Sequence, residues 1–217
     1  MSRAPSLSGL ILAAGESTRM GTDKALLAWP PAGSAIPGPP GQTFLSAAIR
    51  ALSPFTDVVT VVVGKNEQNL STVVYASGAG LVRNPTPELG QFSSLQTGLR
   101  DLLNRGRDGA MITLVDRPPA SAATLQTLLT AFVTALSDGK WAVVPEYGGK
   151  HGHPVLVGRE MIEAFLRAPA SSTARDIEHQ NQQHIQYVDV DDPYVVSNVD
   201  TPQEYSALQS QLASQLK

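Results

Sequence analysis

The residues best suited to bind phosphate lie together in one short loop near the N-terminus. The loop contains Gly15, Ser17 and Gly21, and it also carries Arg19 and Lys24. Glycines allow successive backbone N–H groups to turn toward an anion. A guanidinium can hold phosphate oxygens with paired hydrogen bonds, and an ammonium adds a mobile positive charge. This composition predicts a site for a polyphosphate such as a triphosphate; an ordinary polar turn is the alternative.

The spacing of this loop excludes the two most common phosphate-binding motifs. A P-loop requires a Ser or Thr directly after its lysine, whereas Ala25 follows Lys24. The dinucleotide fingerprint G-x-G-x-x-G is also absent from the segment. A different kind of phosphate loop is therefore expected.

A second candidate residue, Asp116, directly follows an apolar run at residues 110–115. Pro118 comes two residues later and would end a strand there. In parallel sheets covered by helices, ligands bind beyond the carboxyl ends of the strands. We therefore expect Asp116 at the ligand-binding edge of a sheet, although a capping or turn role would explain this residue on its own.

The elements that must position these residues are short apolar runs alternating with amphipathic segments. The runs are continuously apolar, which is typical of strands covered on both faces of a sheet. Alternating strands and helices predict an α/β fold with a doubly wound, mostly parallel sheet and helices on both faces. We expect strands at residues 7–14, 58–64, 110–115, 141–145, 153–157 and 185–190, and helices at residues 44–52, 95–103, 122–136, 161–166 and 202–216.

The composition limits the class of protein. A chain of 217 residues suits one α/β domain, and we expect residues 1–217 to form a single domain. The absence of cysteine excludes disulfides, thiolate zinc sites and cysteine nucleophiles. A net charge of -3 without a long basic run argues against a nucleic-acid partner.

Nothing in the sequence predicts a membrane or secretory location. The N-terminal apolar run is too short for a secretory signal, and no run is long enough to span a bilayer. We expect a cytoplasmic protein without a membrane partner, either a monomer or a weak dimer. The proline-rich segment 30–41 is expected to be an exposed loop.

The string LILAAGESTRMGTDK, residues 10–24, resembles the opening signature of the MobA/MocA-like molybdenum cofactor nucleotidyltransferases. This family belongs to the nucleoside-triphosphate transferases. The resemblance implies a Rossmann-like nucleotide-diphospho-sugar transferase fold whose first loop binds the nucleotide. The implied binding residues are Leu12, Ala13, Ala14, Gly15, Ser17, Arg19, Gly21 and Lys24.

Two further motifs of the family concern a metal ion. Residues 116–118 resemble a D-x-P motif whose aspartate binds magnesium, and residues 198–202 resemble a late N-x-[DN]-T-P element where a strand end leads into the last helix. The resemblance implies that Asp116 and Asp200 bind Mg²⁺, which prefers few carboxylates together with phosphate oxygens and water. Arg117 stands where the cytidylyl branch usually has Gln, and it could contact a phosphate or face solvent.

The chemistry implied by this family needs little covalent work from the protein. A phosphate oxygen of the acceptor would attack the α-phosphorus of the triphosphate and release pyrophosphate. Arg19, Lys24 and the ion held by Asp116 would spread the negative charge that develops, so these are the expected catalytic residues. A phosphate nucleophile is already ionised near neutral pH and needs no general base.

Three features resemble the cytidylyl branch and favour CTP over GTP. Ala14 stands where guanylyltransferases usually have glycine, and its methyl group would crowd a purine. The spacing G-x-x-S-S-L-x-x-G at residues 90–98 and the string GHPVL at residues 152–156 also match. Serines here could cap a helix and bind a base edge. The nucleotide- or pterin-binding residues expected from these motifs are Asn84, Gly90, Ser93, Ser94 and His153.

The leading hypothesis is a cytidylyltransferase acting on a molybdopterin-type cofactor, with hand-over of the product to a molybdenum hydroxylase. A guanylyltransferase, and a transferase for a sugar phosphate or another small phosphate acceptor, remain alternatives. A third alternative is a non-catalytic cofactor-binding protein. Arg175 could meet an acidic acceptor, but a surface role explains this arginine equally well.

Overall fold

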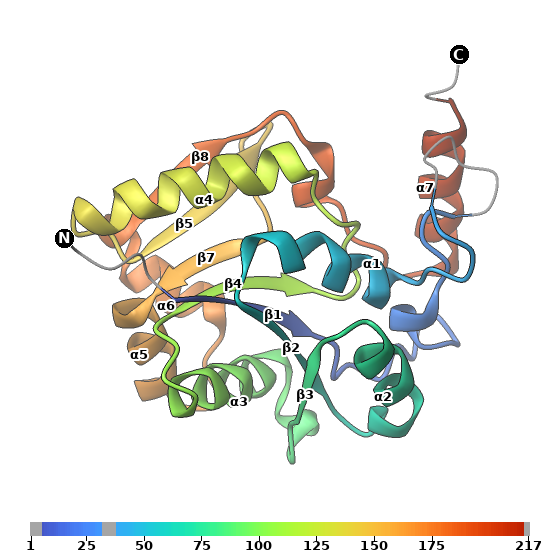
Figure 1. The fold of residues 1–217 in the computed structure, drawn as a ribbon, viewed down its shortest axis with the longest axis horizontal. Helices are drawn as coiled ribbons and strands as arrows, with labels where there is room; N and C mark the ends of the chain where they lie inside the picture. The colour runs from blue at the N-terminus through green and yellow to red at the C-terminus, as the bar shows by residue number, and fades with distance from the viewer. Residues whose placement is uncertain (1–5, 32–37, 215–217) are drawn as a thin grey trace.

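The computed structural model describes residues 6–31 and 38–214. Within these residues an eight-stranded sheet forms, with the order β3-β2-β1-β4-β7-β5-β6 and with β8 paired to β5 (Figure 1). The strands are β1 Leu7–Leu12, β2 Val58–Val63, β3 Gly80–Arg83, β4 Gly109–Leu114, β5 Ala142–Tyr147, β6 Lys150–His151, β7 Val155–Gly158 and β8 Ile185–Asp189.

The sheet is parallel except where β7 and β6 join it. Strands β1, β2, β3 and β4 pair in parallel, as do β5 and β8. β7 runs antiparallel between β4 and β5, and β6 pairs antiparallel to β5. The predicted doubly wound, mostly parallel sheet is therefore confirmed, and β7 is an antiparallel strand in its middle.

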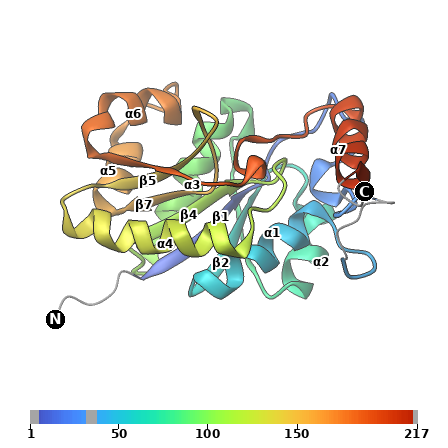
Figure 2. The same ribbon diagram turned by 90° about the horizontal axis from the view of Figure 1, so that it is seen from above.

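Helices cover both faces of the sheet, as Figure 2 shows. Side chains of α1, α2 and α4 form one apolar cluster with the sheet, and those of α3, α5 and α6 form a second cluster on the other face. Leu10 and Ile11 of β1 belong to opposite clusters, because successive strand residues face opposite sides. The helices are α1 Phe44–Leu52, α2 Glu67–Ala76, α3 Gln91–Asn104, α4 Ala122–Ser137, α5 Arg159–Arg167, α6 Ala174–Gln180 and α7 Pro202–Ser214.

The last helix, α7, lies apart from these two layers (Figure 1). Leu208 and Leu212 of α7 belong to a third cluster that includes Trp29 and Phe44. The hydroxyl of Tyr205 donates to the carbonyl oxygen of Ala28 at 2.9 Å. These contacts hold α7 against the segment that follows the first loop.

The strands and helices predicted by residue range are all present, with shifted ends. The first strand ends at residue 12 instead of 14, and α3 begins at residue 91 instead of 95. The predicted strand at residues 153–157 begins only at residue 155, so His153 precedes it. Four elements were not predicted, namely α2, β3, β6 and α6. Their sequences are short or weakly patterned: α2 contributes only two buried side chains, and every residue of β3 is partly or fully exposed.

The proline-rich segment follows the first loop in the chain. Residues 32–37 of the predicted loop fall outside the described residues. The described residues 30–31 and 38–41 contain neither helix nor strand, as expected of a loop. Residues 38–41 are exposed, but Pro31 is buried and Pro30 is half-buried, so the predicted exposure holds only for part of the segment. An isolated bridge between Ala28 and Thr43 closes the base of this segment.

Candidate functional site

The first loop leaves β1 at the carboxyl edge of the sheet and turns sharply. Ser17 has a φ of 51° and Gly21 a φ of 72°, so two left-handed residues shape the turn. The N–H of Lys24 donates to the hydroxyl of Ser17 at 3.1 Å, which closes the loop on itself. Among the described residues, the N–H groups of Gly15 and Glu16 have no hydrogen-bond acceptor in the protein. The loop therefore offers unused donors of the kind that bind an anion.

A residue that was not predicted, Asn66, holds this loop in place. Its side-chain amide donates to the carbonyl oxygen of Ala13 at 2.9 Å and to the carboxylate of Asp23 at 2.8 Å. Its carbonyl oxygen accepts the N–H of Gly64 at 3.1 Å. Both ends of the loop are thereby fixed to the turn after β2. The sequence offered no signal for Asn66, because Ala13 and Asp23, its two partners in the loop, are far away along the chain.

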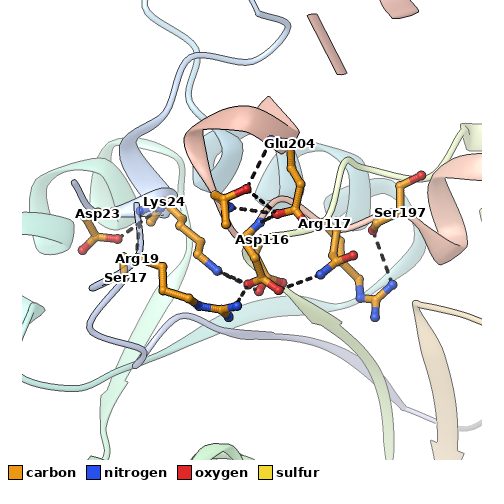
Figure 3. Close-up of polar contacts among 12 residues, drawn as sticks. Ser17, Arg19, Asp23, Lys24, Asp116, Arg117, Ser197 and Glu204 are labelled. Atoms are coloured by element: carbon orange, nitrogen blue, oxygen red, sulfur yellow. Dashed lines mark hydrogen bonds and ion pairs between the residues drawn. The ribbon is translucent and has the colours of Figure 1, made fainter. Parts of the chain in front are cut away.

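The two predicted aspartates converge on one lysine, and Figure 3 shows Lys24 directed toward Asp116. The ammonium of Lys24 lies 3.4 Å from Oδ2 of Asp116 and also forms an ion pair with Oδ1 of Asp200. A guanidinium nitrogen of Arg19 lies 3.2 Å from the same oxygen of Asp200. Lys24 is largely buried, with 12% of its side chain exposed, whereas Arg19 is 67% exposed. Two residues of the first loop and two distant aspartates thus form one charged centre.

The carboxylates retain capacity for a further cation. Oδ1 of Asp116 is buried and has no hydrogen-bond partner in the protein. Oδ2 of Asp200 accepts from the side-chain amide of Asn198 at 2.8 Å, and the hydrogen bond from Lys24 is the main reason that the pKa of Asp200 is lowered. An unpaired buried carboxylate oxygen beside a second ionised carboxylate suits a magnesium ion. The residues present therefore fit the predicted metal.

Backbone contacts explain why Asp200 reaches Asp116. The N–H of Val199 donates to the carbonyl oxygen of Asp116 at 2.8 Å. The carboxylate of Glu204 accepts the N–H groups of Asp200 at 2.7 Å and of Thr201 at 2.8 Å, as in a helix cap (Figure 3). The predicted start of the last helix at residue 202 is confirmed. The strand expected before it is absent from the described residues, since a 3-10 helix, Pro193–Val196, precedes this segment.

Two clefts adjoin the first loop. One lies between the loop, the end of β4 and the start of α3, and Ser94, Lys24 and Asp116 contribute to its wall. The other lies between the loop and the turn after β2, next to Lys65 and Asn66. The predicted residues at these clefts are Leu12, Ala14, Gly15, Ser17, Gly21, Lys24, Ser94 and Asp116.

The two adjacent serines do not cap α3 as expected. Gly90 is the N-cap residue and has no side chain, while Ser93 and Ser94 lie inside the first turn. The amide of Asn84 donates to the hydroxyls of Ser93 at 2.9 Å and of Ser94 at 3.0 Å. The hydroxyl of Ser93 in turn donates to the carbonyl oxygen of Gly90 at 2.7 Å. Asn84 and Ser93 therefore serve a buried network, and of these three only Ser94 lines the cleft beside the loop.

A third cleft of about 540 Å³ adjoins the cleft beside the first loop, with which it shares Leu12, Gln91 and Leu114. We call it the distal cleft. The start of α3 and the segment around α6 contribute to its wall, and it contains no residue of the loop beyond Leu12. Its polar and charged lining residues include Gln91, Arg117, His153, Arg175 and Glu178.

Arg117 and His153 meet in the distal cleft. The N–H of His153 and the guanidinium of Arg117 both donate to the carbonyl oxygen of Val195, at 2.8 Å and 3.2 Å. Burial, with a smaller effect of the nearby Arg117, lowers the pKa of His153 to about 3, so the imidazole is neutral near pH 7. Burial also lowers the pKa of Arg117. Arg117 therefore neither faces open solvent nor joins the charged centre; it anchors a carbonyl group and lines this cleft.

A glycine makes this arrangement possible. A Cβ atom on Gly152 would lie 2.3 Å from the carbonyl oxygen of Val195, which is too close for any side chain. The N–H of Gly152 donates to the carbonyl oxygen of Pro145 at 2.8 Å. The glycine of the GHPVL string thus permits the close approach that places His153 at the distal cleft.

A glycine-rich loop and two carboxylates at the carboxyl edge of a doubly wound sheet define a nucleotide-binding α/β protein. Residues 9–186 match the family described as the MobA-like NTP transferase domain. Because this match covers most of the chain, the protein belongs to that family. The family resemblance and the nucleotidyltransferase class predicted from the sequence are therefore confirmed.

Known relatives agree with this family. The chain is 31% identical over 128 residues to the probable molybdenum cofactor guanylyltransferase of Rhodopirellula baltica. The matched region covers 59% of this chain and 56% of that relative, so it spans little more than half of the relative's length.

Two solved structures share the fold. Rv0371c from Mycobacterium tuberculosis has a TM-score of 0.77 at 23% identity, covering 96% of this chain and 100% of that one. Molybdopterin-guanine dinucleotide biosynthesis protein A from Archaeoglobus fulgidus has a TM-score of 0.68 at 14% identity, covering 95% and 99%. At these identities the similarity establishes the fold alone. No helix in the described part of the chain is long and apolar enough to span a membrane.

Proposed function

We propose that this protein is a magnesium-dependent nucleotidyltransferase that transfers a nucleoside monophosphate to the phosphate of a molybdopterin-type cofactor and releases pyrophosphate. The observation that carries the proposal is the convergence of Lys24, Asp116 and Asp200 beside the first loop. The name of the relative from Rhodopirellula baltica supports the molybdenum cofactor as the acceptor.

The first loop would bind the triphosphate. Its unused N–H donors and the ammonium of Lys24 can hold phosphate oxygens, and the exposed guanidinium of Arg19 can move toward them. Asp116 and Asp200 would hold the magnesium ion, which would supply charge neutralisation at the α-phosphate and the departing pyrophosphate. The residues of this chain position the reactants and provide fixed charge, which is the main contribution of proteins to phosphoryl transfer.

Different observations favour CTP and GTP as the nucleotide donor. The sequence motifs favour CTP, and Ala14 lies in the walls of both clefts beside the loop, where its methyl group could limit the size of a base. The name of the curated relative favours GTP. We propose CTP as the donor and a guanylyltransferase as the second candidate.

Turnover measured as pyrophosphate release tests the proposal. We expect release with Mg²⁺, CTP and the cofactor as acceptor, and a loss of about a hundredfold or more in Asp116→Asn, because such electrostatic contacts typically contribute this much. Asp189→Asn, which changes an exposed aspartate on β8, is the matched control and should keep full turnover.

The other outcomes separate the alternatives. A preference for GTP would replace the base assignment and leave the acceptor unchanged. Turnover with sugar phosphates but not with the cofactor would favour a different acceptor. If no phosphate acceptor supports pyrophosphate release while the cofactor still binds, the protein is a cofactor-binding protein. A molybdenum hydroxylase would then be sought as the partner that receives the cofactor or its product.

A further inference from the structure

The distal cleft contains a carboxyl group that the proposed transfer reaction does not use. Glu178 of α6 lines this cleft, and no hydrogen bond or ion pair to its carboxyl group is found among the described residues. Burial alone raises its pKa to about 7, and no neighbouring cation offsets this effect. Glu178 is half-buried, so its carboxyl group is partly desolvated yet can still be reached by a ligand that completes its hydrogen bonds.

The position of Glu178 is well defined. α6 begins with a capping box, in which the hydroxyl of Thr173 accepts the N–H of Asp176 at 3.1 Å while the carboxylate of Asp176 accepts the N–H of Thr173. Ile177, next to Glu178, packs into the apolar cluster that covers this face of the sheet. Glu178 therefore projects from a fixed helix and not from a loose loop.

The rest of the cleft wall suits a flat, partly polar molecule. Phe92, Leu95 and Leu114 supply apolar surface. His153 and Arg117 add polar groups to this wall, and Nδ1 of His153 and Nε of Arg117 are buried without a protein partner. An apolar cleft with a few convergent polar groups is the usual form of a small-molecule site.

We infer that Glu178 recognises the acceptor by receiving hydrogen bonds from an amino group and an adjacent ring N–H on the edge of a pterin. This inference rests on the proposed function. A carboxylate can accept two parallel hydrogen bonds from such an edge. Guanine presents the same pair of donors. The distal cleft shares Leu12, Gln91 and Leu114 with the cleft beside the first loop, but neither the glycine turn nor Lys24 lines it. The edge that Glu178 binds is therefore that of the acceptor and not that of the nucleotide.

Fluorescence titration with 6-hydroxymethylpterin tests this assignment in the whole protein. The wild-type protein should bind this pterin about tenfold or more tightly than lumazine, in which an oxo group replaces the amino group. Glu178→Gln should lose this preference by binding the pterin more weakly. Glu160→Gln, which changes an exposed glutamate on α5, is the matched control and should retain it.

Each result has a definite meaning. Binding of magnesium–CTP and magnesium–GTP should be the same in wild-type protein and Glu178→Gln, which also verifies that the variant is folded. Equal pterin affinity in both proteins overturns the role of Glu178 and leaves the proposed function standing. Weakened GTP binding in the variant assigns Glu178 to guanine and overturns the inference. Absence of pterin binding by the wild-type protein contradicts the proposed acceptor itself, and the inference with it.

Discussion

At the scale of single residues, Lys24 occupies the place between the two carboxylates that a metal ion would take. Its ammonium contacts both Asp116 and Asp200. A divalent cation that arrives alone must compete with this ammonium. A nucleotide that brings the cation also brings phosphates, which give Lys24 a new partner. The geometry thus favours entry of metal and nucleotide together.

Replacing Lys24 should therefore have opposite effects on the affinities for the metal ion and for the nucleotide. In Lys24→Met, Mn²⁺ without nucleotide should bind about tenfold more tightly, because two carboxylates lose their internal cation. Nucleotide binding should become weaker. Isothermal titration with MnCl₂ measures the first effect, and Lys65→Met, which removes an exposed ammonium paired with Glu16 at 2.8 Å, is the control. Unchanged affinity for Mn²⁺ would show that Lys24 does not compete for this position.

The raised pKa of Glu178 has a consequence for stability. Its folded-state pKa of about 7 exceeds the ordinary value of 4.5, so the folded protein holds a proton that the unfolded chain releases between these values. Stability from this group is therefore present at low pH and is lost as the pH rises through 7. Glu178→Gln should match the wild-type melting temperature near pH 4.5 and exceed it at pH 8. Melting curves across this range measure the difference, and a constant offset at every pH would contradict the explanation.

At the scale of elements, the first loop depends on a side chain from the neighbouring strand–helix turn. Asn66 precedes α2 and satisfies Ala13, Asp23 and Gly64 with its three hydrogen bonds. The sequence predicted the loop from its glycines and charges but not the residue that fixes it. Hydrogen bonds between distant segments have no periodic signature, whereas a strand or an amphipathic helix has one.

Asn66→Ala should loosen the loop without removing any group that contacts phosphate. The free energy of unfolding should fall by about 1–3 kcal/mol, since buried partners lose their hydrogen bonds. The KM for the nucleotide should rise more than kcat falls. Urea unfolding and steady-state kinetics measure both effects, with Asn69→Ala, an exposed residue beside the same cleft, as the control. An equal effect of Asn69→Ala would contradict the role of Asn66 in holding the first loop in place.

At the scale of the whole molecule, the sequence predicted the sheet better than the clefts. Continuous apolar runs identified the central strands. The first loop and Asp116 follow the paired parallel strands β1 and β4, so both lie at the same edge of the sheet. The antiparallel direction of β7 was not predicted, because a strand's own residues do not specify its orientation. The distal cleft was not predicted as a single site. Part of its wall comes from the segment around α6, which was not predicted because this helix has only seven residues and one buried side chain.

The carbonyl oxygen of Val195 connects the distal cleft with the segments that carry Asp116 and Asp200. It receives the N–H of His153 from the distal cleft and the guanidinium of Arg117, which follows Asp116 in the chain. The same guanidinium reaches the carbonyl oxygen of Ser197 at 3.4 Å, three residues before Asp200. A shift of Arg117 would therefore disturb both aspartates at once. Binding on the two sides is therefore coupled in both directions. If a ligand beside His153 increases the affinity for the polyphosphate, the polyphosphate must increase the affinity for that ligand by the same factor.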